Sequence, residues 1–197
     1  MQEKLINKFI TQKRFQKYGS IEVYEKNLLL SKKYYIPLSI LEVSLRNAIN
    51  THFEKFYGAG WLINEASFLQ RDQIKKIEEA KHKIRARKEE ISKEKLLAEL
   101  SLGFWVNLFK KPYEQQMRIS SLRQIFSNLP KKEEKHISRK ELFAALNHIR
   151  NFRNRIFHHE KIVGKQVFQN IEQEINDMIG YLDQELLDFS QRLNGVH

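Results

Sequence analysis

Residues 138–157 read SRKELFAALNHIRNFRNRIF, and this stretch decides the fold class. Ser138 with Glu141 three residues later is the signature of a capping box at the start of a helix. The apolar residues that follow recur mainly at spacings of three and four, the period of one buried helix face. They are Leu142, Ala145, Leu146, Ile149, Phe152, Ile156 and Phe157. The stretch therefore predicts an amphipathic helix that packs against other helices.

The rest of the 197-residue chain carries similar signals. Apolar spacing predicts further helices over about 20–53, 93–109, 113–126 and 166–193, with Pro37 expected to end or kink the first near Tyr35. The segment about 66–95 is strongly charged, which is typical of a solvent-facing helical arm. With 7 Gly and 3 Pro the chain has few residues for tight hairpins, which argues against a β-sandwich or barrel. We therefore predict an all-α single domain, 1–197, formed by an antiparallel helical bundle with an additional charged arm.

Composition excludes several classes of protein. The absence of cysteine excludes a disulfide framework, a CxxC redox site, a zinc ribbon and a cysteine nucleophile. No glycine-rich phosphate loop or G-x-S-x-G elbow occurs, which sets aside nucleotide hydrolysis and serine esterase chemistry. The longest apolar stretches, such as 36–41, are far shorter than the roughly 20 residues that span a bilayer, so we expect a cytoplasmic protein with no membrane contact. The net charge of +11 indicates a polyanionic partner, with nucleic acid the first candidate.

The positive charge is concentrated between residues 131 and 165. This segment holds ten Lys or Arg against four Glu, a net of +6, together with four of the seven histidines. A phosphodiester site needs this combination, because Arg binds phosphate oxygens with two hydrogen bonds and His transfers a proton near neutral pH. The residues that we expect to contact RNA phosphates are Lys131, Lys132, Arg139, Lys140, Arg150 and Arg155.

Arg153 occupies an unusual position in this segment. It follows Ile149 by four residues and precedes Ile156 by three, so it lies on the apolar stripe of the predicted helix. A cation there must be paired or must serve an internal cleft, because an unpaired buried charge is costly. His158 is about 140° away on an ideal helix, so the two side chains converge only if the helix ends near Phe157 or a second subunit supplies the partner.

Three polar residues of the first predicted helix are candidates to support this site. Glu42 and Arg46 are four residues apart, which suits an intrahelical ion pair. Alternatively, Glu42 or its neighbour Asn47 reaches across the bundle to hold Arg153 or the histidines.

Four stretches in order carry a family resemblance: LEVSLRNAI at 41–49, FYG at 56–58 followed by Trp61, LGFWVNLF at 102–109, and RNRIFHH at 153–159. In the last stretch Arg153 to His158 has the form R-N-x-x-x-H, which resembles the R-x(4–6)-H signature of the HEPN superfamily. The series spans roughly residues 14 to 163 and is similar to the Abi-like, or abortive infection, branch of that superfamily.

The resemblance implies a HEPN-like bundle and a metal-independent endoribonuclease without a cofactor. It also implies a homodimer that brings two motifs into one cleft, and a role in antiphage defence or in a toxin–antitoxin pair, with an antitoxin or a regulatory RNA as a further partner. By match to the motif, Arg153 and His158 would be catalytic and Asn154 would be the polar residue that often follows the arginine. His159 also satisfies the permitted spacing, so both histidines remain candidates.

The chemistry also follows from RNA itself, because its 2′-hydroxyl is a built-in nucleophile. The protein need only remove that proton, stabilise the charge on the phosphate and protonate the leaving 5′-oxygen. Three other interpretations stay open. They are a metal site at 158–160, a non-catalytic RNA-binding or regulatory protein, and a structural bundle in which Arg153 simply pairs with Glu42.

Overall fold

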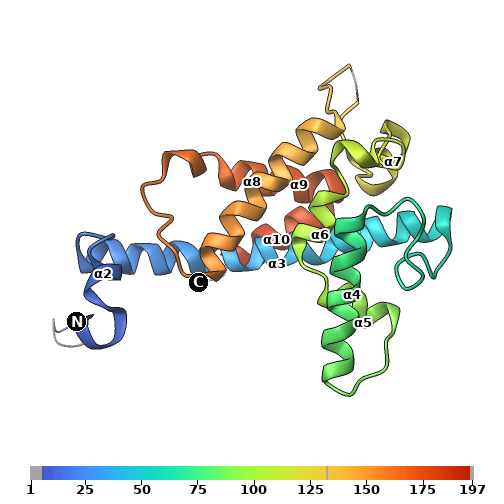
Figure 1. Cartoon of the computed structure of the whole chain (residues 1–197). Helices are drawn as coiled ribbons and strands as arrows, with labels where there is room; N and C mark the ends of the chain where they lie inside the picture. Colours follow the sequence, from blue (N-terminus) through green and yellow to red (C-terminus); the bar gives the residue numbers. More distant parts are fainter. Residues whose placement is uncertain (1–5, 132, 196–197) are drawn as a thin grey trace.

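The structure is a computed structural model that describes residues 6–131 and 133–195. Over this part of the chain the regular elements are all helices and no strand occurs, which confirms the all-α prediction (Figure 1). The longest helix, α3 (Ile21–Tyr57), runs along the molecule, and α9 (Ile171–Leu182) and α10 (Gln184–Gly195) pack on it. Helix α8 (Arg139–Phe157) packs on α9 and on the short helix α6 (Leu102–Asn107).

Pro37 was expected to end or kink the first helix near Tyr35. Helix α3 continues through Pro37, so the expectation that it ends there is wrong. A proline inside a helix loses one backbone hydrogen bond and costs about 3 kcal/mol. Here Pro37 itself is buried together with Tyr34 and Leu38, on the side where α9 and α10 pack. Burial of this face offsets the local penalty, and the helix ends only at Gly58, whose φ of 84° favours glycine.

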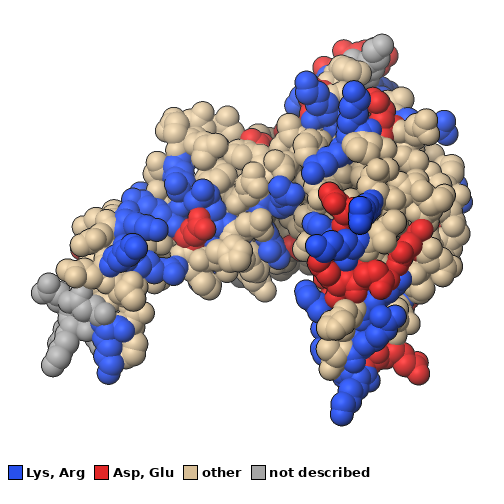
Figure 2. All heavy atoms as spheres, in the orientation of Figure 1, with Lys and Arg blue, Asp and Glu red and all other residues tan. Residues whose placement is uncertain are grey.

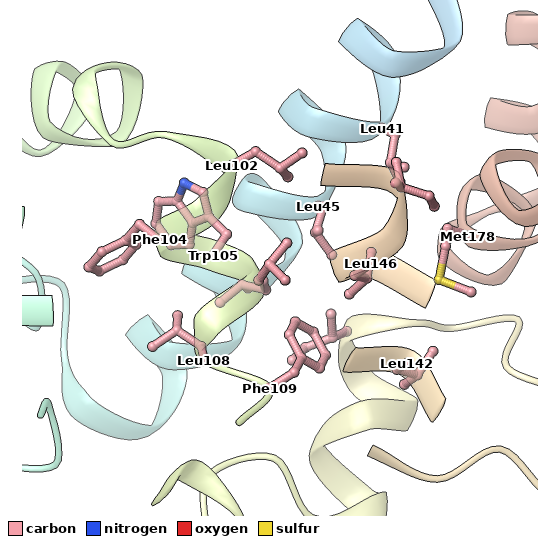
Figure 3. Packing of buried hydrophobic residues seen from close by; sticks show 14 of the residues in the cluster. Leu41, Leu45, Leu102, Phe104, Trp105, Leu108, Phe109, Leu142, Leu146 and Met178 are labelled. Carbon is pink, nitrogen blue, oxygen red and sulfur yellow. The ribbon is translucent and has the colours of Figure 1, made fainter. Parts of the chain in front are cut away.

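Helix α6 lies at the centre of the apolar core, between α3 and α8 (Figure 3). Phe104 and Trp105 on α6 are fully buried with their ring centres 4.9 Å apart, and Leu45 of α3 and Leu146 of α8 lie on the other side of α6 from Phe104. The cluster continues toward α9 through Met178 (Figure 3). The first six residues of LGFWVNLF therefore form a short helix in which Leu102, Phe104, Trp105 and Val106 are buried.

Two of the long helices expected from apolar spacing are broken into shorter pieces. The 93–109 prediction splits into α5 (Lys93–Glu99) and α6, because the backbone at Leu100 is extended, with ψ of 125°. The 166–193 prediction splits into a 3₁₀ turn (Gln166–Phe168), α9 and α10. At the α9–α10 break the Asp183 carboxylate accepts a hydrogen bond from the Leu186 N–H at 3.1 Å, which caps α10.

The 113–126 prediction is also shorter than expected, since only α7 (Ile119–Ile125) is α-helical and Lys111–Tyr113 is a 3₁₀ turn. Tyr113 is buried, and its hydroxyl donates to the Gln73 side chain at 3.1 Å and accepts from the Gln70 N–H at 3.0 Å. The capping box at Ser138 and Glu141 is confirmed at the start of α8.

The charged segment contains α4 (Arg71–Ala86), which packs against α5 and extends with it away from the other helices (Figure 1). One face of α4 is buried through Ile77 and Ile84, so the segment shares the apolar core. Ion pairs join this segment to α5, because Glu99 lies 3.3 Å from Lys83 of α4 and 2.9 Å from Arg87, the residue after α4. The N-terminal part forms a π-helical turn (Ile6–Ile10) and the short helix α2 (Gln12–Phe15) beside the start of α3.

His52 on α3 gives the fold a pH-dependent contribution. Its side chain packs near the rings of Phe53 and Phe56, only 5% of the residue is exposed, and its Nδ1 has no partner among the described residues. Burial therefore lowers the pKa of His52 below its usual value. As pH falls through about 6.5 the unfolded chain binds a proton that the folded chain rejects, so this contribution to stability is present above that pH and is lost below it.

When the pH falls from about 7 to about 5, we expect the free energy of unfolding to decrease less for His52→Gln than for the wild type. The variant has no imidazole at this position that could take up a proton on unfolding. Urea unfolding of both proteins at each pH measures the difference. A free-energy gap between the two proteins that is the same at both pH values would contradict the assignment.

Candidate functional site

The end of α8 places both histidines directly after the last helical residue. The helix ends at Phe157, His158 leaves helical geometry with ψ of 8°, and His159 is left-handed with φ of 55°. The Glu160 N–H then donates to the Arg155 carbonyl at 2.7 Å, which closes the turn. Both imidazoles are exposed at the helix end, so the condition that the helix ends near Phe157 is met.

Arg153 is held between α8 and α3. Its Nε donates to the Glu42 Oε2 at 3.2 Å, and its guanidinium carbon lies 4.0 Å from the centre of the Phe157 ring. The side chains of Arg153 and Glu42 are both partly buried, at 26% and 21% exposed. A carboxylate on one side and a ring face on the other fix the plane of the guanidinium.

The geometry therefore decides between the two alternatives for Glu42. Its carboxylate pairs with Arg153 of α8, across the bundle, and not with Arg46 on its own helix. Arg46 forms no ion pair within the described residues, and its Nε is buried without a partner there. Asn47 is exposed and Asn154 is exposed, so neither contributes to the contact between α3 and α8.

Asn27 is a site residue that the sequence interpretation missed. It is 2% exposed on α3, and its Oδ1 accepts from the N–H groups of Ile162 and Val163 at 2.7 and 3.1 Å. Its Nδ2 donates to the Glu160 carbonyl at 3.4 Å. One side chain thus satisfies three backbone groups of the segment after α8 and fixes that segment on α3. The sequence does contain a sign of this role. Asn27 precedes the buried Tyr34 by seven residues, which places both side chains on the same face of the helix.

A pocket of about 530 Å³ opens between this segment and the N-terminal part of the chain. His158 and His159 line it together with Tyr18, and so do five cations, which are Arg14, Lys17, Arg155, Lys161 and Lys165. Glu160 is the carboxylate in its wall, and it pairs with Arg155 at 2.7 Å. Figure 2 shows Lys and Arg gathered on this side of the molecule, at the left of the view, with little acidic surface among them.

The N-terminal part is attached to the histidine turn by hydrogen bonds. The Arg14 guanidinium donates to the His159 carbonyl, and the Tyr18 hydroxyl lies 3.5 Å from the same oxygen. Burial raises the pKa of Tyr18, which keeps its hydroxyl a neutral donor. Lys161 donates in return to the Lys17 carbonyl at 2.9 Å.

The residues expected to bind RNA do not form one patch. Helix α8 has 19 residues and is about 27 Å long, and it separates Lys131 and Lys140 from Arg155 at its other end. Arg139 is largely buried, donates to the Phe109 carbonyl and lies 3.8 Å from Glu114, so it serves the fold. Lys132 lies outside the described residues.

Arg150 and Arg153 lie on the middle and last turns of α8. The Arg150 side chain packs beside Gly103 of α6, and its Nε is buried without a partner among the described residues. Arg153 is absent from the lining of the 530 Å³ pocket, so within one chain the motif arginine and the motif histidines face different spaces.

His148 does not line the 530 Å³ pocket and contacts α9 and the 3₁₀ turn before it. Its Nδ1 lies 2.7 Å from the Glu174 Oε2, and its ring stacks on Phe168 with centroids 5.2 Å apart.

Within the described residues, no three His, Asp or Glu side chains gather closely enough to hold one metal ion. Over the same residues, no helix combines the length and apolar character needed to cross a bilayer.

The chain matches no protein-family model, and comparisons with curated proteins and with solved structures find no match either.

We expect Asn27→Ala to lower the free energy of unfolding by about 2 to 3 kcal/mol, because it leaves the buried Ile162 N–H without an acceptor. Asn47→Ala on the same helix is the matched control, since Asn47 is exposed, and it should change stability by less than about 0.5 kcal/mol. Urea unfolding checks both values, and equal losses would show that Asn27 is not an anchor.

Proposed function

We propose that this protein is a metal-independent endoribonuclease that cleaves single-stranded RNA through attack of the 2′-hydroxyl, using the R-x4-H motif of the HEPN superfamily. One arrangement carries the proposal. Arg153 is fixed by Glu42 and Phe157, and two exposed histidines follow at the end of the same helix, beside a pocket lined by cations.

The residues suit the reaction as follows. His158 or His159 removes the proton of the 2′-hydroxyl, and that oxygen attacks the adjacent phosphorus. Arg153 and the pocket cations stabilise the added negative charge, and a protonated histidine donates to the leaving 5′-oxygen. The products are a 2′,3′-cyclic phosphate and a 5′-hydroxyl, so no oxidant, metal or cofactor enters the balance. Asn154, exposed beside Arg153, is a candidate to bind the substrate.

A homodimer is part of the proposal, because Arg153 and the histidines of one chain do not line the same pocket. The exposed rings of Tyr35 and Phe157 lie 6.3 Å apart next to Arg153 and form an apolar surface that a second copy would cover. A two-fold axis through this surface would place one chain's arginine near the other chain's histidines.

The biological setting that we propose is an abortive-infection or toxin–antitoxin system of the Abi-like kind, in the cytoplasm. In this proposal the fold is a HEPN-like bundle in which α4 and α5 form the additional charged arm. An antitoxin or a regulatory RNA is then the expected inhibitor, because an unrestrained ribonuclease harms its own cell.

The test is cleavage of labelled single-stranded RNA in chelator by the wild type, by His158→Ala and by His159→Gly. Glycine is used at 159 because the left-handed backbone there strains other residues. Loss of a positioned proton-transfer group should reduce the cleavage rate by about 10²- to 10⁴-fold in at least one of these variants, or in the variant that carries both substitutions. Mass analysis should find a cyclic phosphate end, and RNA with 2′-deoxyribose at the cleaved position should be inert.

The matched control is His136→Ala, because His136 is exposed near the other end of α8. It should cleave at the wild-type rate, and circular dichroism should give the same helical content for all variants. Full activity in the variant that lacks both His158 and His159 would overturn the proposal.

A non-catalytic RNA-binding or regulatory protein is the second candidate, and the Glu42 contact favours it by partly neutralising Arg153. In that case the wild type binds RNA without cleaving it. Lys131→Gln with Lys140→Gln would then weaken binding as much as Arg153→Lys does. If Arg153 is only structural, its replacement lowers the free energy of unfolding and neither RNA binding nor cleavage is found.

A further inference from the structure

We infer that the pocket between α2 and residues 158–165 is a subsite for a backbone phosphate of single-stranded RNA, next to the phosphate that is cleaved. Arg14 and Lys17, which lie far from the motif in sequence, are part of it. The inference rests on the proposed function for the identity of the ligand, while the site itself is argued from charge and geometry.

The pocket carries positive charge that no carboxylate of its lining neutralises. Five cations and one carboxylate line the pocket, and Glu160 is already engaged by Arg155. Among the described residues, Arg14, Lys17, Lys161 and Lys165 form no ion pair with a carboxylate. Cations gathered around one concave surface repel each other and raise the local potential, so an anion that binds there relieves the repulsion.

Hydrogen bonds hold the walls of the pocket in place. Its two walls are joined by the Arg14 and Lys161 hydrogen bonds to backbone carbonyls on the opposite wall. Asn27 holds the 160–163 part of one wall with three further hydrogen bonds. The charged groups of Arg14 and Lys161 and the backbone that carries Lys165 are therefore placed before any ligand arrives, which reduces the ordering cost of binding.

The pocket also lies next to the two candidate catalytic histidines. His158 and His159 lie in the wall of the same pocket, so an anion held there is close to the imidazoles. The pocket is open to solvent and its volume of about 530 Å³ suits a phosphate with its sugar. Cations from three separate segments suit an extended polyanion that passes through, and two of them, Lys17 and Lys165, are exposed to solvent.

The test measures binding of a short 2′-O-methyl RNA, which cannot be cleaved by 2′-hydroxyl attack, by fluorescence anisotropy at several salt concentrations. The variant combines Lys17→Gln and Lys165→Gln, both exposed. Each lost phosphate contact to a single strand reduces the salt slope by about 0.7, so the slope should fall by about 1.4. The dissociation constant at 0.1 M salt should then rise about 25-fold.

A variant with Lys75→Gln and Arg85→Gln is the matched control, because it removes the same charge from exposed positions of α4, away from α2 (Figure 1). It should keep the wild-type slope. An unchanged slope in the pocket variant, or an equal fall in the control, would overturn the subsite. Circular dichroism of each variant confirms that its helical content is kept.

The subsite and the proposed function fail separately. If the wild type does not cleave RNA but the pocket variant loses slope, the nuclease proposal is wrong and the subsite stands. If the wild type cleaves RNA and the pocket variant binds the 2′-O-methyl RNA with an unchanged slope, the subsite is wrong and the nuclease proposal stands.

Discussion

Burial of one face of α3 is the constraint on which the rest of the structure depends. The helix has 37 residues and is about 55 Å long, and α9 and α10 lie along it. The same helix carries Asn27 and Glu42, fifteen residues or about 22 Å apart. One rigid element therefore places both the loop after α8 and the arginine within α8, and displacement of α3 would move the two together.

Most helices were predictable from the period of their apolar residues, and their ends were less so. Pro37 shows why, since a local penalty of about 3 kcal/mol is outweighed by burial on both sides of it. Asp183 shows the opposite case. Its carboxylate caps a new helix within a continuous apolar pattern, and this is a local signal that spacing alone does not reveal.

The candidate site was predictable where its residues are close in sequence. The capping box, the end of α8 near Phe157 and the inward position of Arg153 all follow from one stretch of sequence. The contributions of Arg14, Lys17 and Asn27 do not, because each contacts residues more than 130 positions away and no local period reports such a contact. The net charge of residues 131–165 suggested one cationic surface, but α8 holds the two ends of this segment apart.

The hydrogen bond from Arg14 to the His159 carbonyl joins residues 145 positions apart. During synthesis the N-terminal wall of the pocket emerges first and has no partner until the chain beyond Lys165 has left the ribosome. Closing so long a loop is entropically unfavourable until the core helices bring its ends together. A chain that ends before residue 158 therefore lacks one whole wall of the pocket, whatever its N-terminal part does.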